Sequence, residues 1–194
     1  MGKTKDLSLM TLEELWQLFP IILTEHQERW EEWYVEEASL LKEKLPMELV
    51  DRISHIGSTA ISGIWAKPTI DILVEITKTA SFAELKPIIE CCGYRCMAET
   101  EQRTDFNKGY TPNGFAERVF HLHLRQTGDN DELYFRDYLN SNPAAAKEYE
   151  HLKLRLWKLY EHDRDAYTLH KSDFVKSCTE KGKQLFNNKY GTKY

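Results

Sequence analysis

The chain has 194 residues, a length typical of one globular domain, so we expect residues 1–194 to fold as a single unit. Its 26 Lys and Arg residues against 31 Asp and Glu residues give a net charge of −5, which argues against general nucleic-acid binding. A hydrophobic content of 41% excludes a disordered chain. No apolar stretch approaches the roughly 18 residues of a membrane span, and no apolar signal segment follows the polar start, so we expect a soluble protein with no membrane partner.

Cysteine usage indicates a reducing compartment. Of the four cysteines, Cys91, Cys92 and Cys96 crowd together and Cys178 lies far away, a pattern that fits neither a disulfide framework nor a paired zinc module. We therefore predict that Cys91, Cys92 and Cys96 are buried free thiols, and that the protein is cytoplasmic.

Two capping-box patterns predict the first helices. Thr11-Leu-Glu-Glu14 opens a short helix, and Thr24-Glu-His-Gln27 opens a longer one that runs to about Leu45, where Pro46 ends it.

The middle of the chain predicts strands around one helix. We expect a helix capped by Ser81 and stopped near Gly93. Strands are expected at Leu49 to Ile56, Thr69 to Ile76, Tyr94 to Met97, Arg103 to Tyr110 and Val119 to Arg125. A turn is expected at Pro112 to Gly114, between the last two strands.

The rest of the chain is predicted to be helical, at Glu132 to Leu139, Pro143 to Tyr160 and Ser172 to Asn188. The order of the elements predicts an α+β fold with a helical C-terminal region.

The segment between the first two predicted strands has the composition of an anion site. Gly57 and Ser58 follow a strand, where backbone N–H groups approach an anion without a Cβ in the way, and the Ser58 and Thr59 hydroxyls add donors. Asp71 lies on the next strand, so a phosphate cradle and a carboxylate would meet in one crevice, with Ile70, Ile72 and Val74 buried on the opposite face. The alternative is an ordinary Gly-Ser turn.

Five motifs give this sequence its resemblance to the GrpB family. They are His55-Ile-Gly-Ser-Thr-Ala, Lys67-Pro-Thr-Ile-Asp71, His121-Leu-His-Leu124, Phe135-Arg-Asp-Tyr-Leu139 and Asp165-Ala-Tyr-Thr-Leu-His-Lys171. The match runs in order from about Leu23 to Lys183 and leaves residues 1–22 as an N-terminal extension. The resemblance implies a nucleotidyltransferase-like mixed β-sheet flanked by helices, a fold whose signature is Gly-Ser, a spacer and Asp-x-Asp on the next strand.

The sequence departs from that signature. Leu73 occupies the position of the second acid, and Glu75 lies four residues beyond Asp71, roughly 13 Å along a strand. Paired metals in phosphoryl-transfer sites sit about 3.5–4 Å apart, so Glu75 is a poor replacement ligand.

Two histidines offer another ligand set. His121 and His123 share one face of a strand, and with Asp71 they would form a His-His-carboxylate site that favours zinc, manganese or iron over magnesium. The alternatives are that they line a polar pocket without a metal or that they fill a buried structural role.

Further candidates surround the same crevice. Lys67 precedes Pro68 at the mouth, where its ammonium would pair with a phosphate or with Asp71, unless it is a solvated loop residue. Arg103 is a candidate phosphate ligand on a strand leading to His121. By the family resemblance, His55, Tyr167 and Lys171 are candidate pocket residues, with helix packing as the alternative for the last two.

These observations predict a protein that binds a nucleotide or another phosphorylated small molecule. As an enzyme it would catalyse nucleotidyl transfer, with a divalent cation (Mg, Mn or Zn) on Asp71 stabilising the leaving pyrophosphate while Ser58 and Lys67 hold phosphate oxygens. One alternative, favoured by Leu73, is a noncatalytic ligand-binding or interaction protein. Another is a metal-dependent hydrolase that uses the histidines.

Overall fold

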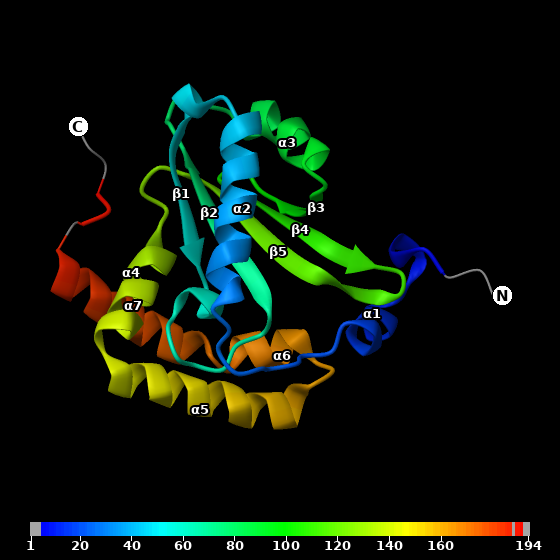
Figure 1. The fold of residues 1–194 in the computed structure, drawn as a ribbon, viewed down its shortest axis with the longest axis vertical. Coiled ribbons are helices and arrows are strands. Elements are labelled where there is room, and N and C mark those ends of the chain that lie inside the picture. Colours follow the sequence, from blue (N-terminus) through cyan, green and yellow to red (C-terminus); the bar gives the residue numbers. More distant parts are fainter. Residues whose placement is uncertain (1–4, 188, 192–194) are drawn as a thin grey trace.

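A five-stranded mixed sheet forms the centre of the computed structural model, which describes residues 5–187 and 189–191 (Figure 1). The strand order is β1-β2-β5-β4-β3. The strands are β1 Val50–Ile56, β2 Thr69–Ile76, β3 Arg95–Glu99, β4 Arg103–Thr111 and β5 Gly114–Gln126.

The register of the sheet brings three strands together at the predicted crevice. β1 and β2 pair antiparallel with Ile56 beside Asp71, which confirms that these strands are neighbours. β2 and β5 pair parallel with Asp71 beside His121. β4 pairs antiparallel with β5, and Asp105 lies opposite His123. Because side chains alternate along a strand, these acidic and imidazole side chains share one face of the sheet.

The opposite face carries the main hydrophobic core. Ile70, Ile72 and Val74 are fully buried there, as predicted. They pack with residues of helices α2 (Arg29–Lys44) and α3 (Phe82–Cys91). Figure 1 shows α2 running across this face.

Helices of the C-terminal half cover the face that carries Asp71. They are α4 Asp131–Ser141, α5 Pro143–Tyr160, α6 Arg164–Leu169 and α7 Ser172–Phe186. Leu133 of α4 packs against Leu73 and Ile56, so this face is apolar next to β1 and polar next to β5. Figure 1 shows these helices grouped together beside and below the sheet.

Several shorter elements complete the chain. Helix α1 (Leu12–Leu18) begins at the predicted capping box, in which Thr11 Oγ1 accepts from the Glu14 amide at 3.2 Å. The 3₁₀ helices are η1 Leu7–Leu9, η2 Met47–Leu49 and η3 Ser58–Ala60.

Three element predictions need correction. Helix α2 begins at Arg29 and not at Thr24, because the Thr24 backbone pairs with Ala66, with both N–H···O distances at 2.9 Å. Strand β5 begins at Gly114, five residues before the predicted start at Val119, since it continues the hairpin with β4. Helix α6 was not predicted.

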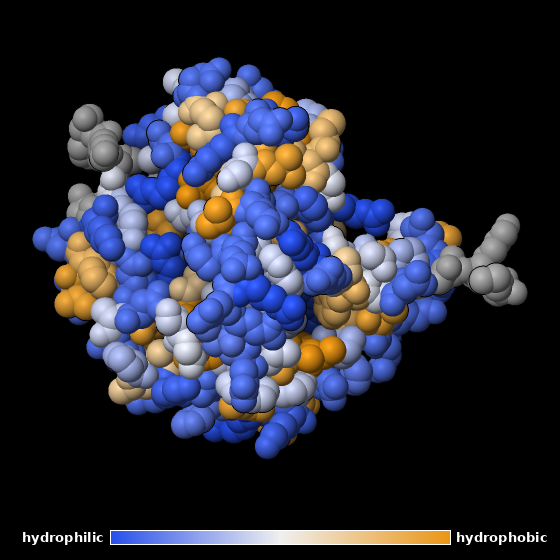
Figure 2. Space-filling model, viewed as in Figure 1, coloured by the Kyte–Doolittle hydropathy of each residue, from blue (hydrophilic) through white to orange (hydrophobic). Residues whose placement is uncertain are grey.

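Helix α7 ends at Phe186, and Asn188, its predicted end, lies outside the described residues. The four cysteines are free thiols, but the predicted burial of the clustered three is wrong, since Cys91 is exposed and Cys92 and Cys96 are only partly buried. Within residues 5–187 and 189–191, no helix has both the length and the apolar composition to cross a membrane. Figure 2 shows a mainly hydrophilic surface on the face where α2 lies.

Candidate functional site

A cavity of about 300 Å³ lies between the polar part of the sheet and helices α5 and α6. We call it the basic pocket. Its lining residues are Ile21, Ser58, Lys67, Thr69, Asp71, His121, His123, Lys153, Arg164, Tyr167, Thr168 and Lys171. The structure thus brings together seven predicted site residues, namely Ser58, Lys67, Asp71, His121, His123, Tyr167 and Lys171.

Gly57 lets the loop after β1 pass close to Asp71. Its φ is +71°, and a Cβ at this position would lie 2.0 Å from Asp71 Oδ2. Glycine is therefore required both for the backbone conformation and for the approach. This contact places Ser58 on the wall of the basic pocket next to the carboxylate.

A chain of hydrogen bonds connects Asp71 to helix α6. His121 Nδ1 lies 3.1 Å from Asp71 Oδ1, and His121 Nε2 lies 2.8 Å from the Tyr110 hydroxyl. Arg164 Nη2 donates to the same hydroxyl at 3.2 Å. Burial lowers the pKa of His121 more than Asp71 raises it, so the ring is neutral and donates one hydrogen bond while accepting the other.

His123 lies between two carboxylates. Its Nδ1 is 2.8 Å from Asp105 Oδ1, and its Nε2 is 3.8 Å from Asp71 Oδ1. Burial opposes the charged form, but Asp105 and Asp71 outweigh it and raise the pKa of His123 to about 9. His123 is therefore an imidazolium at neutral pH.

The carboxylates of Asp71 and Asp105, which flank His123, are both ionised. Burial alone would raise the pKa of Asp71, yet the His121 and His123 imidazoles hold it well below its usual range. Burial likewise opposes ionisation of Asp105, and His123 and Arg125 overcome it and lower the pKa to about 2. Arg125 Nη2 contacts Asp105 Oδ1 at 2.5 Å.

Four basic side chains line the basic pocket together with Asp71: Lys67, Lys153, Arg164 and Lys171. The Lys153 ammonium also donates to the Trp65 carbonyl. Burial, together with the charges of Arg164 and Lys171, lowers the pKa of Lys67 to about 7. Burial and Lys171 lower the pKa of Lys153, which is 1% exposed, to about 7 as well. Such shifts mean that these ammonium groups lack enough negative charge in their surroundings. An anion in the pocket would supply it.

The candidate metal ligands are arranged for hydrogen bonding. Asp71, His121 and His123 do lie on one face, as predicted, but the imidazole nitrogens face Asp71, Tyr110 and Asp105. No three His, Cys, Asp or Glu side chains in the described part of the chain are grouped so as to hold a metal ion. Leu73, at the position of the second acid, is fully buried. The donor set thus does not fit a divalent cation in this arrangement.

His55, a predicted pocket residue, and Thr59, a predicted phosphate ligand, lie on the far side of the loop from the basic pocket. His55 pairs with Ile72 and therefore points to the opposite face of the sheet, where its ring stacks on Tyr34 at 4.7 Å. Its Nε2 lies 3.0 Å from Thr59 Oγ1, which donates to the Thr69 carbonyl at 3.1 Å. His55 and Thr59 thus hold the loop in place and do not line the basic pocket.

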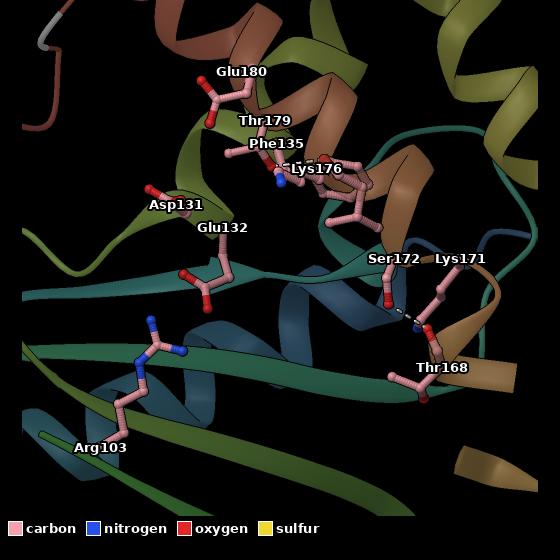
Figure 3. Close-up of a pocket in the computed structure, with 11 residues that line it drawn as sticks. Arg103, Asp131, Glu132, Phe135, Thr168, Lys171, Ser172, Lys176, Thr179 and Glu180 are labelled. Atoms are coloured by element: carbon pink, nitrogen blue, oxygen red, sulfur yellow. Dashed lines mark hydrogen bonds between the residues drawn. The ribbon is translucent and has the colours of Figure 1, made fainter. Parts of the chain in front are cut away.

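Arg103, predicted as a phosphate ligand, lies in a different cavity. Its register partner is Arg125, four residues beyond His121 along β5, and it forms a two-pronged ion pair with Asp129 at 2.7 and 2.6 Å. It lines a neighbouring cavity of about 390 Å³. Figure 3 shows it across that cavity from Lys171 and Ser172. The structure does not bring Arg103 into the basic pocket.

Four residues of the site were missed from the sequence. Lys153 occupies the buried stripe of α5 between Tyr149 and Leu156, and a lysine in that stripe was a usable signal. Asp105 and Tyr110 lie on β4 at site-facing positions, but only the sheet register reveals this. Arg164 had no local signal, because its role depends on where α6 packs.

Comparison with known proteins gives one consistent family. A family model described as GrpB protein matches residues 20–181. The glutamate-rich protein GrpB of Alkalihalophilus pseudofirmus is 36% identical over 162 residues, covering 80% of this chain and 91% of that protein. UPF0157 protein YqkA of Bacillus subtilis is 31% identical over 162 residues, covering 82% of this chain and 46% of that protein, so the chain spans about half the length of this relative.

Solved structures agree with the predicted fold class. The crystal structure of the conserved protein GrpB from Enterococcus faecalis matches with a TM-score of 0.74 at 33% identity, covering 85% of this chain and 99% of that one. The structure of the GLD-2/RNP-8 complex matches with a TM-score of 0.52 at 11% identity, covering 95% of this chain and 74% of that one. At that identity the likeness concerns the fold alone. The mixed sheet and its helices form a nucleotidyltransferase-like fold, as predicted.

Proposed function

Because this chain belongs to the GrpB family and carries the basic pocket on a nucleotidyltransferase-like fold, we propose that it binds a phosphorylated small molecule, such as a nucleotide, in that pocket. The observation that carries this proposal is the imbalance of charge. Lys67, Lys153, Arg164 and Lys171 line one cavity together with the His123 imidazolium, and Asp71 is the one acidic residue among its lining residues.

A phosphate group suits this environment on physical grounds. It carries close to two negative charges and offers several acceptor oxygens, which matches a cluster of ammonium and guanidinium donors and the Ser58 hydroxyl. The volume of about 300 Å³ lies at the lower end of the range for ligand pockets. It therefore favours a small ligand, or the phosphate end of a larger one.

Within this proposal we favour binding without nucleotidyl transfer. Transfer requires a divalent cation between the phosphates, and the carboxylate chemistry for it is incomplete, since Leu73 packs in an apolar cluster with Ile56 and Leu133. The His123 imidazolium occupies the space between Asp71 and Asp105, where it supplies a positive charge next to the phosphate position. The same hydrogen bonds argue against a hydrolase built on the histidines.

Calorimetry of phosphate binding tests the proposal. Inorganic phosphate and ATP are titrated at pH 6.5, where Lys153 is mostly protonated, into the wild-type protein and Lys153→Met, a substitution that keeps the volume and removes the charge. We expect binding by the wild type and an affinity at least about tenfold lower in the variant, the value of one charged hydrogen bond. Lys158→Gln, on the same helix but outside the pocket, should bind like the wild type.

Repeating the ATP titration with Mg²⁺, Mn²⁺ and Zn²⁺ and measuring pyrophosphate release separates binding from transfer. Release by the wild type would overturn the noncatalytic part and restore metal-dependent transfer. An unchanged affinity in Lys153→Met, or no binding of either anion under any condition, would overturn the phosphate site itself.

A further inference from the structure

A larger cavity, of about 750 Å³, adjoins the basic pocket. We call it the aromatic cavity. One wall comes from the N-terminal segment, with Leu7, Leu12, Leu15, Trp16 and Phe19. The other walls come from the end of α3, the segment leading into β3, and from β3, β4 and α6, with Tyr94, Met97, Asn107, Tyr110 and Thr168 and the charged side chains of Glu90, Arg95, Lys108, Arg164 and Asp165. Figure 2 shows hydrophobic side chains gathered in the area where Figure 1 places α1 against the sheet.

The two cavities share part of their lining. Arg164 and Thr168 line both. Tyr110 lines the aromatic cavity, and its hydroxyl contacts His121 of the basic pocket at 2.8 Å. Arg164, Thr168 and Tyr110 thus form the boundary between the basic pocket and the aromatic cavity.

Where the two cavities meet, the walls are aromatic, and their side chains pack against one another. Phe19 packs against Tyr110 and Phe115, with ring centroids 4.8 and 5.0 Å apart. The Arg164 guanidinium lies 5.7 Å from the centre of the Tyr110 ring. Flat rings beside a guanidinium provide stacking and cation–π surfaces for an aromatic group.

The wall contributed by the N-terminal segment lies outside the region shared with the family. The family match begins at residue 20, and α1 spans Leu12–Leu18. Leu12, Leu15 and Trp16 of this segment also have no place in the main core. Their contribution to a cavity gives this otherwise unexplained segment a role.

We propose that the aromatic cavity is a subsite for the organic part of the same ligand, and that this ligand is a phosphate ester of an aromatic group. The inference rests on the proposed phosphate site. Arg164 and Lys171 hold the phosphate, and the aromatic group lies between Trp16 and Tyr110, with Asn107 available to its polar edge. The N-terminal segment then determines ligand preference without contributing to phosphate binding.

The test compares 1-naphthyl phosphate with inorganic phosphate by calorimetry at pH 6.5. In the wild type we expect the naphthyl ester to bind at least about tenfold more tightly, because its ring is removed from water. Trp16→Ala should reduce this ratio to about threefold or less and leave the affinity for inorganic phosphate unchanged. Leu12→Ser, at a half-exposed wall position that the fold tolerates, should also reduce it. Leu9→Ala, in the same segment but outside the cavity lining, should preserve the ratio.

The outcomes separate the two proposals. If inorganic phosphate binds but the naphthyl ester gains nothing, or if Trp16→Ala and Leu12→Ser keep the full ratio, the aromatic subsite is wrong and the phosphate site stands. If neither compound binds to the wild type, the phosphate site fails and the subsite fails with it.

Discussion

Gly57 allows the loop after β1 to approach the carboxylate of Asp71 closely. We expect Gly57→Ala to lower the free energy of unfolding by about 2–4 kcal/mol, because the new Cβ adds both left-handed strain and a clash with Asp71 Oδ2. Urea denaturation measures this loss.

Gly63 provides the matched control for that prediction. It has nearly the same φ, +70°, but nothing lies within 4 Å of a Cβ built there. Gly63→Ala should therefore cost only about 1–2 kcal/mol. Equal losses in the two variants would show that the approach to Asp71 is not tight.

The lowered pKa values of Lys67 and Lys153 make anion binding depend on pH. Both are about 7, so both ammonium groups are present at pH 6 and mostly lost at pH 8.5. Sulfate keeps its charge over this range, and the His123 pKa of about 9 keeps that ring charged. Sulfate affinity measured by calorimetry should therefore fall at least about tenfold from pH 6 to pH 8.5.

The double variant Lys67→Met, Lys153→Met checks the origin of that dependence. It should bind sulfate weakly and with a nearly flat profile between pH 6 and pH 8.5. A wild-type profile that is flat, or a slope that survives in the double variant, would contradict the assignment.

At the scale of elements, one face of strand β2 is polar at Asp71 and apolar at Leu73. Asp71 and Leu73 point to the same side of the strand, yet Asp71 meets polar groups of β5 while Leu73 is buried with Ile56 and Leu133. Leu73→Asp, which would complete an Asp-x-Asp pattern, places an unpaired charge among apolar side chains. We expect a loss of about 3–5 kcal/mol in the free energy of unfolding, measured by chemical denaturation.

Leu73→Met keeps the volume and should lose less than about 1.5 kcal/mol. A stable Leu73→Asp protein would mean that the cluster around position 73 admits water or a counterion. It would also remove the main argument against a two-carboxylate site.

Elements with strong local signals were predicted well. Strand β2 and helix α5 have the predicted bounds, because Pro68 and Pro143 mark their starts and their apolar patterns are regular. The start of α2 was misplaced because Gln27 only bonds the Thr24 hydroxyl, at 3.3 Å, while the Thr24 backbone pairs with a distant strand-like segment. Tertiary pairing overrode a local capping pattern there.

The site residues likewise fall into those that local sequence patterns predicted and those that depend on tertiary packing. Asp71, His121 and His123 were predicted because strand alternation places them on one face. Lys153 and Arg164 come from helices whose packing on the sheet no local pattern specifies. The prediction that Arg103 is a phosphate ligand was wrong for a related reason. Its distance from His121 depends on the register between β4 and β5, which the sequence does not specify.

For the whole molecule, the basic pocket connects two layers, since β2 and β5 form one wall and α5 and α6 another. An anion bound there should stabilise the fold. At about 100 times its dissociation constant, sulfate should add about 2.7 kcal/mol and raise the Tm by roughly 5–10 °C at pH 6. Differential scanning calorimetry measures the shift, with chloride at equal ionic strength as the control for screening.

Lys153→Met with Lys171→Gln should show little of this sulfate-dependent increase. A similar increase in the wild type and in the double variant would indicate a general salt effect and no occupied pocket.

The parallel pairing of β2 with β5 also has a consequence for how the chain folds. Asp71 and His121 are 50 residues apart in sequence, and β3, β4 and α3 all lie between them. Closing so long a loop is entropically costly, and contacts of this range slow folding relative to local hairpins such as β4–β5. The strand pair that carries the ligand-facing residues should therefore be among the last to assemble, so a newly made chain gains its secondary structure before it gains the ability to hold an anion.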